Sequence, residues 1–159
     1  WTYAHNGQLK GFAEELPIKL HLPIGTTDSE HAFCWILDQL HYKFGAEQPS
    51  PKVLFKYMAT LTWKIDELGV ANFIITDGEY LFAYCSNNLH WITRRAPFGK
   101  ASLIDAEMAV DFHKETTDKD IVTVIATQPL TDDETWHKMS AGHWHLFCLG
   151  ESIACGIES

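Results

Sequence analysis

The sequence predicts an α+β fold in which helices pack on one face of an antiparallel β-sheet. Two long segments with helical apolar spacing come first, and short strand-like runs separated by turn residues follow them. A parallel α/β fold would instead alternate strands and helices along the chain. The length of 159 residues, with 46% hydrophobic and 21% charged residues, predicts one globular domain without an internal repeat or a linker.

The first 25 residues contain one expected strand. Residues 1–5 alternate apolar and polar side chains, and Asn6-Gly7 predicts a turn directly after them. Residues 11–25 should be irregular, because prolines and a glycine interrupt any long element there.

Two helices should follow. The first is expected over about residues 26–45, where Thr27, Asp28 or Ser29 could be the N-cap and Gly45 ends the apolar spacing of three and four. The second is expected over residues 51–68, with a proline in its first turn and a glycine directly after it.

The rest of the chain has a strand pattern. Asp77-Gly78 predicts a hairpin turn, and Asn87-Asn88 predicts a second turn. Residues 101–114 are ambiguous, and the β-branched run at residues 120–127 is typical of an inner strand. We expect strands at residues 71–76, 80–85, 89–94, 120–127 and 144–149.

Composition and charge exclude several classes of protein. Twelve Lys and Arg against 21 Asp and Glu give a net charge of −9, which disfavours binding to nucleic acid or to an anionic membrane. The apolar runs are too short to span a bilayer, and the first residues do not form a signal peptide. The four cysteines (Cys34, Cys85, Cys148 and Cys155) form no Cys-x-x-Cys pair, so we expect buried thiols in a reducing, cytoplasmic compartment.

Two clusters of polar residues have ordinary interpretations. His137, His143 and His145 could line a metal site of a hydrolase, but surface or interface histidines beside tryptophans are the favoured interpretation, and we expect no metal or cofactor. Arg94 and Arg95 should point to opposite faces of a strand, with one solvated and the other in an ion pair.

Asn6-Gly7 and Asp28 are the stronger candidates for function. A side-chain amide followed by a glycine N–H can offer two donors to one point, and glycine permits the close backbone approach that such a site needs. Each motif alone is explained by a turn or by a helix N-cap, and their combination, order and spacing raise the functional interpretation.

These residues belong to a wider resemblance to the class II glutamine amidotransferases, which are N-terminal-nucleophile hydrolases. The chain resembles the stand-alone bacterial branch of that family over nearly its whole length. The matching segments are Trp1 to Leu9, Thr27 to Glu30, Ala32 to Trp35, Ala83 to Ser86, Leu89 to Gly99 and Val122 to Thr131.

The resemblance implies a four-layer αββα sandwich of antiparallel sheets and hydrolysis of the glutamine side-chain amide. In the family, the thiolate of an N-terminal Cys attacks that amide, and its own α-amino group is the base. Asn6 and Gly7 would bind the oxyanion of the tetrahedral intermediate, and Asp28 would bind the α-ammonium of glutamine.

The chain departs from the family pattern at its first residue, because Trp1 has no nucleophilic side chain. Residues 1–159 therefore resemble the C-terminal part of one glutamine amidotransferase domain. An N-terminal segment or another chain would complete the fold, and Trp1, Tyr3 or their sheet neighbours should be unusually exposed without it. Two other functions stay open: hydrolysis of γ-glutamyl amides in small peptides, and glutamine binding without catalysis.

Overall fold

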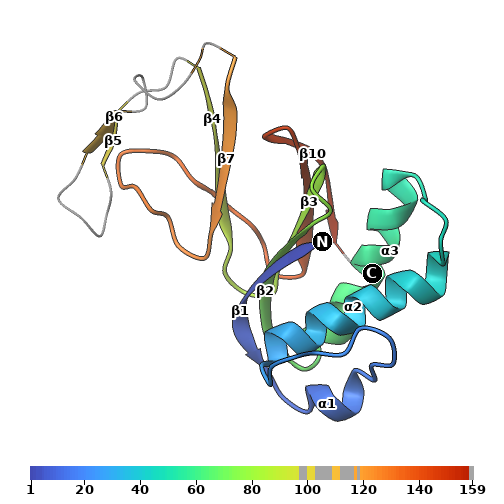
Figure 1. The fold of residues 1–159 in the computed structure, drawn as a ribbon. Coiled ribbons are helices and arrows are strands. Elements are labelled where there is room, and N and C mark those ends of the chain that lie inside the picture. The colour runs from blue at the N-terminus through green and yellow to red at the C-terminus, as the bar shows by residue number, and fades with distance from the viewer. Residues whose placement is uncertain (97–99, 103–108, 112–116, 118, 158–159) are drawn as a thin grey trace.

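The computed structural model describes residues 1–96, 100–102, 109–111, 117 and 119–157. A layer of helices covers one face of a five-stranded antiparallel sheet, and a three-stranded sheet lies against its other face (Figure 1). We refer to these as the first sheet and the second sheet. The elements are β1 (Thr2–Leu9), α1 (Phe12–Glu15), α2 (Asp28–Phe44), α3 (Pro51–Asp66), β2 (Gly69–Thr76), β3 (Tyr80–Cys85), β4 (His90–Arg95), β5 (Lys100–Ser102), β6 (Ala109–Asp111), β7 (Ile121–Ala126), β8 (His137–Lys138), β9 (His143–Cys148) and β10 (Glu151–Ile157).

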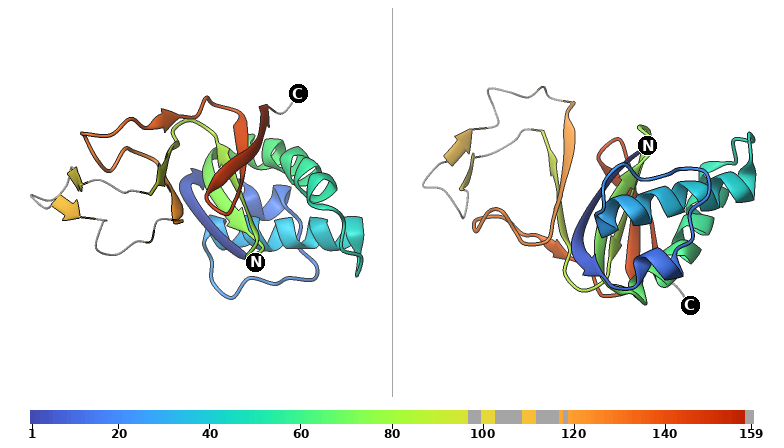
Figure 2. Two further views of the ribbon diagram at one scale, coloured as in Figure 1. Left: turned by 90° about the horizontal axis from the view of Figure 1, so that it is seen from above. Right: turned by 60° about the horizontal axis from the view of Figure 1, so that its bottom comes forward.

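The first sheet has the strand order β1-β2-β3-β9-β10, so β1 and β10 lie at its two edges. Alternate residues of each strand face opposite sides of the sheet. On one side, Phe73 and Phe82 pack against residues of α2 and α3, such as Ile36 and Phe55, in the main hydrophobic core. Figure 2 shows both long helices on this side of the sheet.

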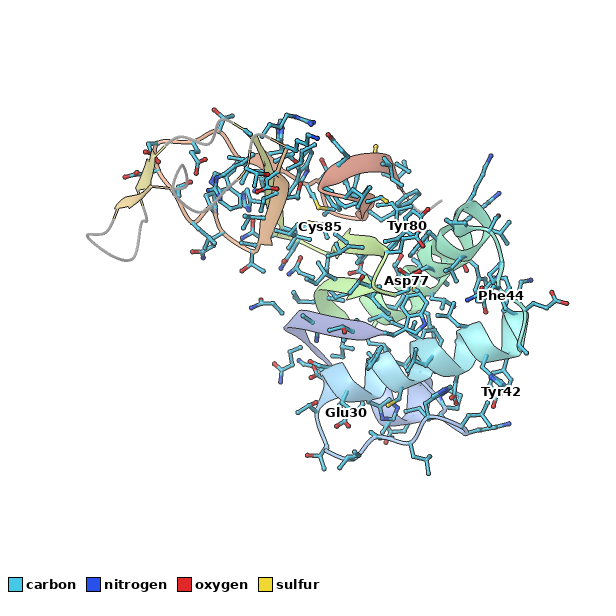
Figure 3. The ribbon with its side chains drawn as sticks, turned by 45° about the horizontal axis from the view of Figure 1, so that its top comes forward. Glu30, Tyr42, Phe44, Asp77, Tyr80 and Cys85 are labelled. Carbon is cyan, nitrogen blue, oxygen red and sulfur yellow. The ribbon has the colours of Figure 1, made fainter. Side chains whose placement is uncertain are left out.

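The second sheet has the order β7-β4-β8 and packs on the opposite side. A smaller core joins the two sheets; it contains Cys85 and Phe147 from the first sheet and Trp91 and Ile125 from the second. Figure 3 shows Cys85 at this junction. The chain passes into the second sheet after β3. A hydrogen bond from the N–H of Gly142 to the carbonyl of Cys85 (2.8 Å) anchors the segment through which the chain returns to the first sheet.

The predicted helices are confirmed. Thr27 is the N-cap of α2, where its hydroxyl accepts a hydrogen bond from the N–H of Glu30 (3.2 Å), and Gly45 ends the helix with a φ of 61°. Ser50 and Pro51 begin α3. The predicted α+β class with helices on one face of an antiparallel sheet is therefore correct, and the described residues form three layers.

The predicted turn at Asn6-Gly7 is wrong, because β1 runs straight through both residues to Leu9. Asn6 pairs with Asn72 and Gly7 with Ala71, so the ladder to β2 extends the strand past this local turn signal. The chain leaves β1 only beyond Lys10, whose N–H still donates to the carbonyl of Leu68 (2.8 Å).

Other strand predictions are right in part. The hairpin around Asp77-Gly78 is confirmed by the pairing of β2 with β3. Within the described residues β7 is an edge strand rather than an inner one, and its β-branched run includes Ile125, which packs toward the first sheet. β8 and β10 were not predicted, and most of the ambiguous segment 101–114 lies outside the described residues.

The prediction for the arginine pair was half wrong, because both side chains form ion pairs. Arg94 binds the carboxylate of Glu134, and Arg95 binds that of Glu151 in β10. The exposure expected at the start of the chain is seen for Trp1, which is 45% exposed, whereas Tyr3 packs between Phe33 and Phe73.

Candidate active site

The open edge of β1 presents its backbone groups at alternate residues. In an antiparallel ladder, the N–H and C=O of one residue point to the partner strand and those of the next residue point away. The bond from Lys10 to Leu68 continues the ladder with β2, which places Asn6 and Gln8 among the residues that point toward β2. The N–H groups of Gly7 and Leu9 therefore point to the open edge.

Asp28 occupies part of this edge. Its carboxylate accepts one hydrogen bond from the N–H of Leu9 (2.8 Å) and another from the N–H of Ser29 (2.8 Å) in the first turn of α2. The Leu9 bond independently supports the direction of the outward amides. Because residues two apart in a strand are separated by roughly 6.6 Å, the Gly7 N–H lies about that far along the edge from the Leu9 N–H.

Gly7 and Asp28 line one pocket of about 440 Å³ at this edge, together with Gln8, Phe12 and Thr26 to Thr27. Among these lining residues only Asp28 carries a charge. The pocket therefore combines an outward backbone N–H with a carboxylate, and it suits a ligand that has an acceptor oxygen and a cationic group a short distance apart.

The position of Gly7 requires glycine. A Cβ atom there would overlap the carbonyl of Val70 and would lie 2.8 Å from the ring nitrogen Nε2 of His5. The backbone of β1 thus approaches β2 more closely than any side chain at this residue would permit.

Asn6 lies one peptide away, and its side chain is exposed and forms no hydrogen bond within the described part of the chain. It lines a second pocket of about 160 Å³ between the start of the first sheet and the end of β7, beside Asn72 and Thr127. The structure therefore brings the three predicted residues together at β1, with Asn6 and Gly7 in the strand and Asp28 beside it in the first turn of α2. Asn6 lies on the second-sheet side of β1, and Gly7 and Asp28 lie on its open side.

The sequence did not indicate two further residues beside this edge, His5 and Ser29. Nε2 of His5 lies 3.1 Å from the carbonyl of Val70, and Nδ1 lies 2.9 Å from the hydroxyl of Ser29. Because a carbonyl can only accept, Nε2 carries a proton, and in the neutral ring Nδ1 accepts from Ser29. This pair connects β1 to the first turn of α2 beside Asp28.

The histidines near the C-terminus do not form a metal site. No group of three or more His, Cys, Asp or Glu side chains among the described residues is arranged to hold a metal ion. His137 and His145 pack against Trp91, and burial together with nearby His143 and His137 lowers the pKa of His145.

None of the four cysteines lies at the β1 edge. Cys34 and Cys85 are buried, and burial raises the pKa of both thiols, so neither is a thiolate at neutral pH. Cys148 in β9 and Cys155 in β10 are separated from β1 by two and three intervening strands. At about 4.8 Å per strand spacing, they lie roughly 14 and 19 Å away across the sheet.

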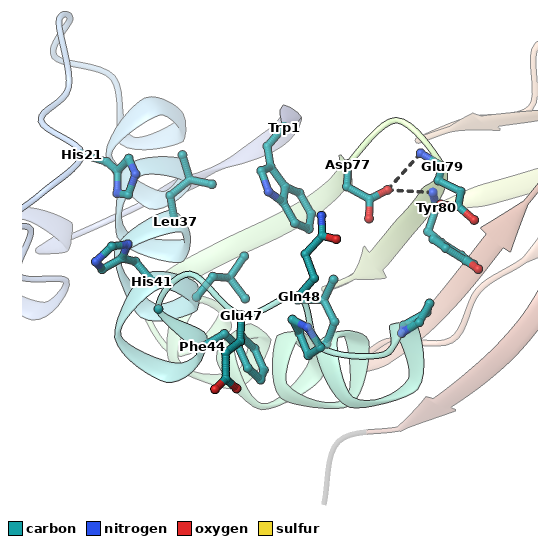
Figure 4. Close-up of a pocket in the computed structure, with 15 residues that line it drawn as sticks. Trp1, His21, Leu37, His41, Phe44, Glu47, Gln48, Asp77, Glu79 and Tyr80 are labelled. Atoms are coloured by element: carbon teal, nitrogen blue, oxygen red, sulfur yellow. Dashed lines mark hydrogen bonds between the residues drawn. The ribbon is translucent and has the colours of Figure 1, made fainter.

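A larger pocket, of about 640 Å³, is a different feature. It lies between the end of α2 and the β2–β3 hairpin, where Trp1, Phe44 and Tyr80 line it (Figure 4). The carboxylate of Asp77 is occupied by the N–H groups of Glu79 and Tyr80 in the hairpin. This pocket contains none of the candidate residues.

Comparison with known proteins identifies the family. The model of the glutamine amidotransferases class-II matches residues 1–159. The chain belongs to this family. A crystal structure of a predicted glutamine amidotransferase from Pseudomonas aeruginosa PA01 superposes with a TM-score of 0.84 at 47% identity, and it covers 97% of this chain and 60% of its own.

Two bacterial glutamine amidotransferase candidates are also similar in sequence. The YafJ protein of Escherichia coli (strain K12) is 52% identical over 153 residues, which are 96% of this chain and 60% of YafJ. A protein of Haemophilus influenzae (strain ATCC 51907 / DSM 11121 / KW20 / Rd) is 42% identical over 97% of this chain and 52% of its own length. The chain thus spans between half and two thirds of these relatives.

No helix among the described residues is both long enough and apolar enough to cross a membrane.

Proposed function

We propose that this chain supplies the oxyanion and ammonium sites of an enzyme that hydrolyses the side-chain amide of glutamine. The observation that carries the proposal is the pocket at the β1 edge, where an outward Gly7 N–H and the Asp28 carboxylate lie on one strand edge. Membership of the class II glutamine amidotransferases makes glutamine the first substrate to test.

The chemistry needs donors at the amide oxygen. When a nucleophile attacks the amide carbon, the oxygen gains negative charge, and hydrogen-bond donors that are already in place lower the barrier most. The Gly7 N–H is held at the open edge, and the Asn6 side chain is free to donate from the neighbouring position. We assign these two groups to the oxyanion.

Asp28 is assigned to the α-ammonium of glutamine. Its carboxylate accepts from the N–H groups of Leu9 and Ser29, and the Ser29 hydroxyl lies 3.4 Å from Oδ1. A carboxylate has about four lone pairs, so at least one is left for a cation in the pocket. The span of roughly 6.6 Å between the outward amides of Gly7 and Leu9 matches a substrate in which a few carbons separate the amide from the ammonium.

The nucleophile is proposed to be an N-terminal Cys outside this chain, because the four cysteines here are buried or far from Gly7. The α-amino group of that Cys would take the proton of its thiol, and the thiolate would attack the amide carbon. The C–N bond would break to leave a thioester, and the nitrogen would leave as ammonia after taking the same proton back from the α-amino group of the Cys. Water would then hydrolyse the thioester to glutamate and free thiol. A separate N-terminal segment would also contribute to the four-layer αββα sandwich of the N-terminal-nucleophile hydrolases.

The first test measures ammonia release from glutamine by the intact protein that contains these residues. Asn6→Ala should lower kcat by about 10²–10³ with little change in KM, because the charge on the oxygen develops only in the transition state. The control is Thr2→Ala, an exposed polar residue on the same face of β1, which should retain wild-type kinetics. A folded Asn6→Ala protein with wild-type kcat would contradict the assignment.

The second test uses residues 1–159 alone. We expect no ammonia release from this chain, and we expect activity on addition of a separately made N-terminal fragment that begins with Cys. Thiol-sensitive activity of the 159-residue chain alone would refute the external nucleophile. If the completed protein binds glutamine without releasing ammonia, the function is binding and not catalysis.

A further inference from the structure

Asn72 is a polar residue in the middle of a buried strand. It lies in β2 directly opposite Asn6 and is only 4% exposed. Its side-chain oxygen accepts from the N–H groups of Asn87 (3.2 Å) and Asn88 (3.1 Å), at the turn that leads into the second sheet. Its side-chain nitrogen donates to Oδ1 of Asn87 (2.8 Å) and to the backbone carbonyl of Asn6 (3.3 Å).

These four bonds use the whole hydrogen-bonding capacity of a carboxamide, which has two donors and two lone pairs. The two N–H groups of the turn fix which end of the amide is oxygen, because the opposite orientation would place N–H against N–H. The NH₂ of Asn72 must therefore face the carbonyl of Asn6.

The carbonyl of Asn6 and the N–H of Gly7 belong to the same peptide group. A trans peptide is planar, and its C=O and N–H point in opposite directions. A donor that holds the Asn6 carbonyl toward β2 consequently directs the Gly7 N–H toward the open edge. A second donor on this carbonyl also polarises the peptide and strengthens its N–H as a donor.

The space on the opposite face of β1, beside Gly7, is also occupied. The His5 ring bonds to the carbonyl of Val70 and lies in the space where a side chain of Gly7 would be. The Asn6–Gly7 peptide is therefore held by Asn72 at its carbonyl and is bounded by His5 beside its glycine.

We propose that Asn72 is a positioning residue that sets the direction and donor strength of the Gly7 N–H for amide hydrolysis. The role rests on the proposed function, because it matters to catalysis only if Gly7 binds the oxyanion. Asn72 itself, buried behind the strand, acts through the peptide and does not contact the substrate.

The test compares two variants of the same hydrogen-bond cluster in the intact protein. Asn72→Asp retains the acceptor for the turn amides but loses the donor to Asn6 and to Asn87. The matched control Asn87→Ala loses only the bond between the two side chains, at an exposed residue, and leaves the bond to Asn6 in place. Asn72→Ala is a second variant in case the buried carboxylate prevents folding.

For glutamine hydrolysis, Asn72→Asp should lower kcat about tenfold and leave KM within about twofold. This loss is smaller than the 10²–10³ expected when an oxyanion donor is removed, because here the donor is misdirected and not deleted. Asn87→Ala should stay within about twofold of wild type in both constants. Equal losses of kcat in the two variants would overturn the proposal, because the effect would then belong to the turn.

A spectroscopic measurement decides the structural part independently. Asn6-Gly7 is the only Asn-Gly step in these 159 residues, so ¹³C′-Asn and ¹⁵N-Gly labelling isolates this peptide in an HNCO spectrum. The cross-peak should move in Asn72→Asp and Asn72→Ala, with its carbonyl shift lowered by the lost hydrogen bond, and should stay in place in Asn87→Ala. An unmoved peak refutes the contact with the Asn6 carbonyl even if the wild type proves unable to hydrolyse glutamine, and a moved peak supports that contact.

Discussion

Asp38 is the residue whose loss should change stability most clearly. It lies in α2, its side chain is fully buried, and its carboxylate accepts four hydrogen bonds from the loop that precedes this helix. The donors are the N–H groups of Lys19 (2.6 Å), Leu20 (3.0 Å) and His21 (2.9 Å) and the ring Nδ1 of His21 (2.7 Å). The same loop continues into Thr26 and Asp28, so it supports one wall of the candidate active site.

The pKa of this carboxyl gives the magnitude. Burial alone would raise the pKa of Asp38, and the hydrogen bonds outweigh burial and lower it from 3.8 to about 2. At about 1.36 kcal/mol for each pH unit, this difference corresponds to about 2 kcal/mol of stability at neutral pH. Because the pKa is lower in the folded state, this contribution is complete above about pH 4 and is lost as the pH falls through 2.

Asp38→Asn should therefore lose at least about 2 kcal/mol at pH 7, since its single carbonyl oxygen cannot serve four donors and its NH₂ faces N–H groups. For a chain of this size, the corresponding fall in Tm is about 4–8 °C. The assay is urea unfolding at pH 7, 4 and 2.5, with Asp77→Asn as the control. That substitution makes the same chemical change at an exposed hairpin turn, where Asn is equally suitable.

The pH dependence is the sharper part of this test. Between pH 4 and 2.5 the wild type should lose part of the Asp38 contribution, and the Asp38→Asn protein should lose less over the same interval. Equal losses in the two proteins, or equal stability at pH 7, would show that the loop does not depend on this carboxylate.

Three further predictions concern the edge of β1. Asp28→Asn should raise the Kd for glutamine by well over tenfold and also lower Tm by a few degrees, because the Leu9 and Ser29 amides bind different carboxylate oxygens and Asn has only one oxygen. Titration calorimetry and thermal melting measure the two effects, and unchanged affinity would remove the substrate role. Gly7→Ala should separate β1 from β2 and abolish activity, because a Cβ at this residue would overlap the Val70 carbonyl. A crystal structure of this variant with the Asn6–Asn72 pairing intact would refute this prediction. In hydrogen exchange without ligand, the Gly7 amide should exchange quickly and the Gln8 and Leu9 amides slowly, whereas a protected Gly7 amide would show that the edge is not open.

The helices could be predicted because their signals are local. The apolar spacing of α2 and the residues at its ends, Thr27 and Gly45, lie within one short segment of sequence. The β2–β3 hairpin was equally local, with Asp77-Gly78 between its strands. The type and the ends of such elements can therefore be predicted from residues that are close together in the sequence.

The candidate site depended on contacts between distant residues. Asn6-Gly7 has the composition of a turn, and only the ladder to β2 shows that it lies in a strand. Asn72 is 66 residues from Asn6 in the sequence, and His5 is 65 residues from Val70. The one available signal was a polar residue, Asn72, between the apolar neighbours Ala71 and Phe73 of an expected strand.

The position of Gly7 in a strand makes the oxyanion assignment stronger than a turn would. In a turn, the direction of an N–H depends on a few local dihedral angles, whereas a strand fixes the direction of every second amide through its ladder. The outward amide of Leu9 is already satisfied by Asp28 at 2.8 Å, so the edge is partly protected from association with another strand. The outward amide of Gly7 lies in the pocket. Because Gly7 has no side chain, a substrate oxygen can approach this amide. Asp28 consequently has two roles at one edge, since it satisfies the strand and supplies the charge of the pocket, and this is why its substitution should affect stability and affinity together.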